Sequence, residues 1–186
     1  SGLDEGLRTE MARLVRKLHE EWKITTILVT HDKAEALRMS DRIALMGHGK
    51  VLQYGTPEQM FYQPETKTVA EYFGKVNYVP GQVIGGRFAS NLFEKRSDLP
   101  DGTYEAMIRP YSVQLQKDGD FEVEEVTFMG EMTEIRVRVP EKIVPGGSIL
   151  CQRMEGIGLQ TKFQAGMKVG LSVETDGVVL FRHGMT

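Results

Sequence analysis

The sequence is poor in several features that mark particular classes of protein, and cysteine is the first of them. Cys151 is the single cysteine in 186 residues, so the chain cannot form an internal disulfide, which favours a reducing compartment such as the cytosol. Cysteine and histidine also show no zinc-type spacing. No apolar run approaches the roughly 20 residues that span a bilayer, and the first residues carry no basic, apolar leader. We therefore expect a soluble protein that could still dock on a membrane partner.

The sequence also has no net positive charge and no clear phosphate-binding glycine loop. The formal net charge is −3, which argues against a strongly basic nucleic-acid surface. The segment Gly47-His48-Gly49-Lys50 lacks the four-residue gap of a phosphate-binding loop, and Val51 follows where such a loop has a hydroxyl residue. We predict a hairpin turn there. The chain has no other candidate for this loop, so it cannot by itself hold a nucleoside triphosphate in that manner.

Among the features that are present, residues 25–39 (TTILVTHDKAEALRM) carry the most chemical information. An apolar run without alternation at 27–29 is typical of a buried parallel strand, and the spacing of Asp32 and Glu35 predicts a capped helix after it. His31 would then lie beyond the carboxyl end of a strand, where α/β proteins bind ligands. Imidazole has a hydrogen-bond donor and an acceptor on opposite edges. His31 is thus a candidate phosphate sensor, and Asp32 is interpreted as a helix cap.

The remaining patterns predict two domains, 1–77 and 78–186, with the boundary near residues 74–80. In the first domain we expect helices over 4–21, from Asp32 on, from Thr56-Pro57 on and over 66–73, with a strand at 25–30 and a hairpin at 43–46 and 51–54. Thr56 supplies a capping hydroxyl for its helix, and Gln59 is placed to reach back to it. In the second, turn residues separate short strands at 82–84, 104–109, 112–116, 121–129, 133–139, 148–152, 168–174 and 178–181. The fold class expected is α/β followed by an all-β barrel or sandwich.

Four stretches of residues 1–77 resemble, in order, the latter part of the ATP-binding subunits of ATP-binding cassette (ABC) importers. They are SGLDEGLRTEM, TTILVTHDKAEAL, SDRIALMGHGKVLQYGTPEQMFYQP and VAEYFGKVN. The resemblance implies a fragment of a P-loop NTPase domain. It makes Ser1, Gly2, Leu3 and Asp4 the D-loop, which touches the opposing subunit. His31 becomes the H-loop switch histidine, which contacts the γ-phosphate and helps to position the attacking water.

The same resemblance implies what a longer parent would supply. The Walker A loop, Q-loop, signature motif and Walker B carboxylates of that family are not among these 186 residues. ATP and Mg²⁺ are therefore expected in the full-length parent, whereas this chain is expected to hold no complete cofactor site and no metal, and to be inactive as an ATPase. The implied partners are a second ATPase subunit and a membrane permease. The implied location is the cytoplasmic face of the membrane, where the permease would hold the protein.

Residues 78–186 resemble the transport-associated barrel of the oligonucleotide-binding type (TOBE domain) behind such ATPases. The segments MIRP at 107–110 and VTFMG at 126–130 carry this resemblance. Domains of this kind occur in importers of polyamines, ferric iron, sulfate, molybdate and sugars. The resemblance therefore implies a regulatory or dimerisation domain in an importer of one of those classes.

Two other functions fit parts of the same domain. A stand-alone barrel could bind single-stranded nucleic acid by stacking bases on aromatic rings beside basic groups, here Phe88, Phe93, Lys95, Arg96 and Arg109. A small-anion sensor could instead use Arg109 or Arg136. The simpler interpretation is that the aromatics fill a core and the charges are solvated. Separately, the strand at 25–30 would lack a neighbour on one edge, which predicts a dimer, possibly with exchanged helical segments.

Overall fold

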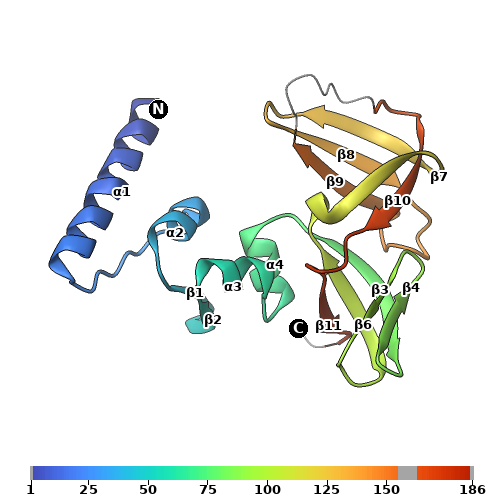
Figure 1. Cartoon of the computed structure of the whole chain (residues 1–186), viewed down its shortest axis with the longest axis horizontal. Helices are drawn as coiled ribbons and strands as arrows, with labels where there is room; N and C mark the ends of the chain where they lie inside the picture. The colour runs from blue at the N-terminus through green and yellow to red at the C-terminus, as the bar shows by residue number, and fades with distance from the viewer. Residues whose placement is uncertain (1, 155–162, 185–186) are drawn as a thin grey trace. The chain divides into compact units, whose positions relative to one another are not determined.

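The computed structural model describes residues 2–154 and 163–184, with side chains from residue 6 onward except those of residues 8 and 9. The chain divides into two compact units, Ser1–Gln63 and Pro64–Thr186 (Figure 1). This division falls earlier than the boundary predicted between residues 77 and 78, because helix α4 (Lys67–Phe73) groups with the second unit. No helix in the described ranges is long and apolar enough to cross a membrane.

The first unit consists of helices and one hairpin, with caps that the sequence predicted. Asp32 caps α2 by accepting hydrogen bonds from the backbone N–H groups of Ala34 and Glu35, at 2.8 and 3.2 Å. Thr56 and Gln59 form a reciprocal capping box at the start of α3, which satisfies backbone donors at both positions. The elements are α1 (Gly2–Trp22), α2 (Lys33–Met39), β1 (Ile43–Gly47), β2 (Lys50–Gly55) and α3 (Pro57–Tyr62).

The strand predicted at residues 25–30 is wrong. Residues 24–30 form no regular element between α1 and α2, and Ile27 and Val29 are 87% and 92% exposed. A strand needs a neighbour to satisfy its backbone groups, and no strand in the described part of the chain pairs with this segment. The apolar residues are suited to a buried strand, but the pairing that would bury them is a non-local requirement. The parallel sheet expected around residues 1–77 is accordingly not observed in the described residues.

The second unit contains two antiparallel sheets that share one core (Figure 1). The five-stranded sheet has the order β11-β6-β3-β4-β5, and the four-stranded sheet has the order β10-β7-β8-β9. The strands are β3 (Asn77–Ile84), β4 (Arg87–Ser90), β5 (Glu94–Arg96), β6 (Gly102–Ile108), β7 (Val113–Phe128), β8 (Met132–Arg138), β9 (Ser148–Met154), β10 (Lys168–Val173) and β11 (Val179–Arg182), with a 3-10 turn at Pro110–Ser112. An all-β class is thus confirmed, and closure into an OB-type barrel stays a prediction.

Helix α4 packs on the five-stranded sheet of its own unit. Its side chains Val69, Ala70 and Phe73 are buried. Ala70 contacts a small apolar cluster with Met107 of β6 and Phe181 of β11. The helix begins at Thr66, whose hydroxyl oxygen accepts a hydrogen bond from the backbone N–H of Val69 at 3.3 Å. Apolar burial on one face and a capped start explain why so short a helix is stable in this place.

Cys151 lies on β9 with no exposed surface, in the core that the two sheets share. Burial raises the pKa of its thiol to about 12. Because the thiolate is the reactive species, we expect a thiol reagent at pH 8 to label native protein at least about 100-fold more slowly than urea-unfolded protein. Mass spectrometry of the labelled fraction with time measures both rates. Equal rates in the two states would contradict the position of Cys151 in the core.

Candidate functional site

His31 lies in the bend that leads into α2, and its side chain is exposed. The bend is held by a hydrogen bond from the backbone N–H of Asp32 to the hydroxyl oxygen of Thr30, at 3.0 Å. Since Asp32 uses its carboxylate to cap α2, the cap fixes the backbone one residue after His31. The local fold therefore presents the imidazole at the start of a helix, although no strand delivers it there.

A surface hollow surrounds His31 within the first unit. The residues that line it are Ala12, Thr30, His31, Asp32, Glu35, Arg38 and Met39. Arg16 of α1 donates a hydrogen bond to the backbone oxygen of Arg38 at 3.3 Å, which joins the two helices that form the walls. The hollow offers imidazole, hydroxyl and guanidinium groups that suit a phosphate oxygen, together with two carboxylates that repel one. A triphosphate held here would need further cationic groups.

The other residues of the predicted nucleotide site are only partly described. Ser1 lies outside the described residues, and Gly2, Leu3 and Asp4 form the first turn of α1 in the backbone. Their assignment as a D-loop stays a prediction. The segment 47–50 is the turn of the β1–β2 hairpin, with His48 and Gly49 at φ 50° and 73°, so the predicted turn is confirmed. Within the described ranges, no group of three or more His, Cys, Asp or Glu residues could hold a metal ion.

Most residues of the nucleic-acid hypothesis lie inside the second unit. Phe88 has no exposed surface, and Phe93 packs against the same core. Lys95 donates hydrogen bonds to the backbone oxygens of Thr175 and Val178 at 3.0 and 2.8 Å, and burial lowers the pKa of its amine. These side chains fill the core or hold a loop, so no stacking surface is formed from them.

Arg109, which entered both alternative hypotheses, is 3% exposed. Its Nη1 donates hydrogen bonds to the backbone oxygens of Ala70 and Lys75, at 2.9 and 3.3 Å. Ala70 belongs to the last turn of α4, where backbone carbonyls lack partners within the helix and attract positive charge. Arg109 therefore holds the end of α4 against β6, and a structural role replaces the predicted contact with nucleic acid or a free anion.

Removing this guanidinium should destabilise the second unit. We expect Arg109→Met to lower the free energy of unfolding by about 2 kcal/mol, because the two backbone oxygens would lose a buried charged donor. The matched control is Arg136→Met, at a side chain that is 45% exposed, where the loss should be less than about 1 kcal/mol. Urea titrations followed by circular dichroism compare the two variants. Equal losses in the two variants would show that Arg109 does not hold α4.

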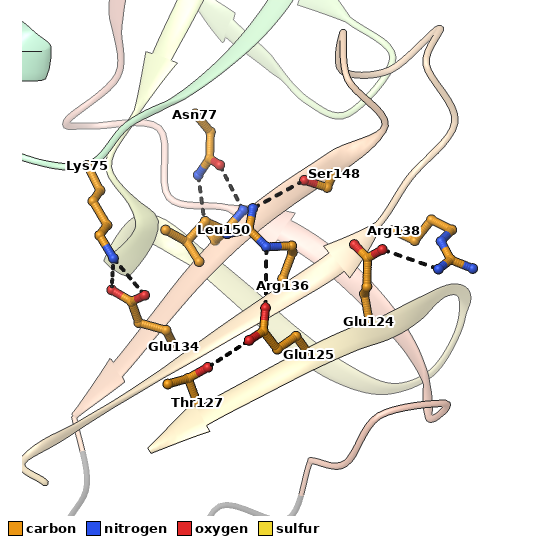
Figure 2. A network of polar contacts seen from close by, with 10 residues as sticks. All are labelled: Lys75, Asn77, Glu124, Glu125, Thr127, Glu134, Arg136, Arg138, Ser148 and Leu150. Atoms are coloured by element: carbon orange, nitrogen blue, oxygen red, sulfur yellow. Dashed lines mark hydrogen bonds and ion pairs between the residues drawn. The ribbon is translucent and has the colours of Figure 1, made fainter. Parts of the chain in front are cut away.

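Arg136 belongs to a set of polar contacts on the outer face of the four-stranded sheet (Figure 2). It lies 3.8 Å from a carboxylate oxygen of Glu125 and also bonds to the hydroxyl of Ser148 at 3.5 Å. Arg138 pairs in the same way with Glu124 at 3.2 Å. Because each arginine has a carboxylate beside it, these groups offer little net positive charge to an anion.

Sequence reasoning missed the residues that connect this face to the segment after α4. The Nζ of Lys75 is 2.7 Å from each carboxylate oxygen of Glu134, and Gln152 donates to the same carboxylate at 2.9 Å. The hydrogen bond from Lys75 holds the pKa of Glu134 below its ordinary value, against the opposing effect of burial. Asn77, 7% exposed, bonds to the backbone of Leu150 (Figure 2). The only signal for these contacts in the sequence was that polar residues, Lys75 and Asn77 among them, lie within the predicted domain boundary.

Comparison with known proteins supplies the assignment that geometry alone does not. No protein-family model matches the chain. It is 40% identical over 136 residues to a sulfate/thiosulfate import ATP-binding protein CysA of Caulobacter vibrioides, with 72% of this chain and 40% of that protein covered. It is 31% identical over 148 residues to an Fe(3+) ions import ATP-binding protein FbpC of Vibrio cholerae, with 74% and 42% covered. The chain belongs to the family of ABC importer ATP-binding subunits.

A third member of this family matches nearly the whole chain. The spermidine/putrescine import ATP-binding protein PotA of Mesorhizobium japonicum is 32% identical over 200 residues, with 98% of this chain and 53% of that protein covered. The chain thus spans about two fifths to one half of the length of these ABC importer subunits, and the matched region is their C-terminal part. Membership of the family confirms the resemblance stated from the sequence motifs.

Proposed function

We propose that this chain acts as the C-terminal portion of an ATP-hydrolysing importer subunit, which couples ATP binding and hydrolysis to uptake of a solute. The observation that carries the proposal is the 40% identity over 136 residues to a sulfate/thiosulfate import ATP-binding protein. The proposed solute belongs to the polyamine, iron, sulfate or sugar class, and relatives named for import of iron(III) and of spermidine/putrescine support two of these classes. The motifs at residues 1–4 and 30–32 support the same role.

Within such a subunit, His31 is the proposed switch histidine. Its exposed position and its place before a capped helix start support this role, since an imidazole there can reach a phosphate oxygen or a water molecule. ATP with Mg²⁺ would supply the reactive triphosphate. The hollow beside His31 contains Asp32 and Glu35, so the charge of the triphosphate must be neutralised by groups of the longer subunit. Ser1, Gly2, Leu3 and Asp4 are proposed to contact the opposing subunit.

The chain alone is proposed to be inactive. Phosphoryl transfer requires several charged groups positioned at once, and the sequence offers no phosphate-binding glycine loop. The all-β unit is proposed to regulate the ATPase and to contribute to subunit association. The partners proposed are a second ATPase subunit and a permease, which would hold the protein at the cytoplasmic face of the membrane.

A hybrid subunit tests the importer function directly. It consists of the part of Caulobacter vibrioides CysA that precedes the matched region, followed by residues 1–186 of this chain. We expect the hybrid to hydrolyse ATP and to restore sulfate uptake in cells that lack their own ATP-binding protein, while residues 1–186 alone do neither. A folded hybrid that binds ATP without hydrolysing it would contradict the proposal.

The chain is also proposed to self-associate through its first unit. Leu7 and Met11 of α1 are more than half exposed, as are Ile27 and Val29 of the following segment, and apolar surface of this extent favours a partner. Light scattering over a range of protein concentrations should show a dimer. Replacing Ile27 and Val29 with Lys should give a monomer, and a wild-type chain that is monomeric at every concentration would refute the dimer.

A further inference from the structure

The three residues between α4 and β3, together with Asn77 at the start of β3, form what we call the strap, Gly74 to Asn77. Two of its side chains reach the four-stranded sheet, although the strap leads directly into the five-stranded one (Figure 2). Lys75 bonds to both carboxylate oxygens of Glu134 on β8. Asn77 bonds to Leu150 on β9. The strap therefore contacts both sheets of the second unit.

The contact between Asn77 and Leu150 resembles a strand pairing made by one side chain. The Nδ2 of Asn77 donates to the backbone oxygen of Leu150 at 2.8 Å, and the backbone N–H of Leu150 donates to Oδ1 of Asn77 at 2.8 Å. β9 is the last strand of its sheet in the order β10-β7-β8-β9. Edge strands present backbone groups without a neighbour. Here the strap supplies those partners, and Asn77 is buried in doing so.

The other end of the strap is fixed to α4. Gly74 donates its backbone N–H to the carbonyl oxygen of Ala70 at 3.3 Å, which closes the last turn of the helix. Arg109 donates from one nitrogen to the carbonyl oxygens of both Ala70 and Lys75, so it binds the helix end and the strap together. With Val69, Ala70 and Phe73 buried below, the helix, the strap and the edge of β9 form a continuous set of contacts.

We propose that the strap is a latch that couples α4 to the β8–β9 edge, so that loosening one end loosens the other. A coupling of this kind is reciprocal by thermodynamic linkage, so the effect of α4 on the edge of β9 equals the effect of that edge on α4. The latch is closed when Lys75 is bonded to Glu134 and Asn77 is bonded to Leu150. It opens when either set of bonds is lost. Since α4 is the first helix after the start of the second unit at Pro64, the latch connects the four-stranded sheet to the N-terminal end of that unit.

The first experiment destabilises α4 and measures amide hydrogen exchange at the edge strand β9. Thr66→Ala removes the cap of α4, and hydrogen–deuterium exchange by NMR then follows the Leu150 amide in the full chain. We expect its exchange to rise about fivefold, whereas the Val83 amide of β3 does not change. The matched control is Thr56→Ala, which removes the same kind of cap from α3 in the first unit and should leave Leu150 unchanged.

The second experiment works in the opposite direction. Glu134→Gln weakens the bond to Lys75 and should raise exchange of the Gly74 amide about tenfold. Glu125→Gln, which alters a carboxylate on the same face that pairs with Arg136, should not. The latch is refuted if Leu150 is unaffected by Thr66→Ala, if Gly74 responds equally to both glutamate variants, or if every rise is matched at Val83.

Discussion

Replacing His31 with alanine is expected to lower ATP turnover of the hybrid subunit by about 100-fold or more. The reason is that a switch histidine acts only when the phosphate is transferred, by holding a phosphate oxygen and the attacking water in place. Its loss should therefore reduce kcat much more than nucleotide affinity. The exposed imidazole and the capped start of α2 support this proposed role of His31. Steady-state release of inorganic phosphate, with nucleotide binding measured separately, checks the expectation.

His48→Ala is the matched control for this experiment. His48 is also exposed and lies in the same unit, but it occupies the turn of the β1–β2 hairpin, away from the hollow that His31 lines. The same chemical change at that position should leave kcat within about twofold of the parent hybrid. Unchanged turnover in His31→Ala, or an equal fall in both variants, would remove the assigned role of His31.

Local patterns predicted the features that neighbouring residues determine. The cap of α2 at Asp32 and the capping box of Thr56 and Gln59 were both confirmed, as was the hairpin turn at 47–50. In each case the partner lies within four residues, so the sequence contains the whole interaction. The strand at 25–30 shows the opposite case. Its composition is that of a strand, but pairing depends on a neighbour that composition does not specify.

The long strand β7 shows how non-local pairing can override a turn signal. The sequence predicted two strands, 112–116 and 121–129, because Asp118-Gly119 between them favours a turn. In the structure β7 runs through this point from Val113 to Phe128. Its first part pairs with β10 and its second part with β8, and the register shifts where the two meet. The turn residues therefore bend one strand between two partners.

The residues of the candidate site and the strap also divide into those that a local motif predicts and those that only tertiary contacts define. His31 could be proposed as a site residue because its motif is local and resembles one in a recognisable family, and its role stays a prediction. The strap could not, since Lys75 is 59 residues from Glu134 and Asn77 is 73 residues from Leu150. Nor could the burial of Arg109 be predicted, because its partners are backbone oxygens with no sequence signature. Polar contacts between sheets depend on tertiary packing, which periodicity does not encode.

The bend in β7 carries the largest stability effect that we expect. A Cβ on Gly119 would lie 2.2 Å from the backbone nitrogen of Gly170 and 2.4 Å from its Cα. Both atoms belong to the backbone of β10, which is held by its pairing with β7 and cannot move aside as a flexible side chain can. We therefore expect Gly119→Ala to lower the free energy of unfolding by about 3 kcal/mol or more, measured by urea denaturation.

Gly170→Ala is a demanding control, because Gly170 is the residue that a Cβ on Gly119 would strike, although its partner in the strand register is Gln116. A Cβ on Gly170 would meet Cβ of Gln116 at 3.6 Å, which is an ordinary contact. Alanine also restricts the unfolded chain more than glycine does, so this variant should be neutral or slightly more stable, within about 1 kcal/mol. The two substitutions add the same methyl group to β7 and to β10, but only the one on Gly119 would meet backbone atoms of the other strand. Similar losses of stability in both variants would mean that the backbones of β7 and β10 do not approach each other closely at Gly119. The bend described for β7 would then be wrong.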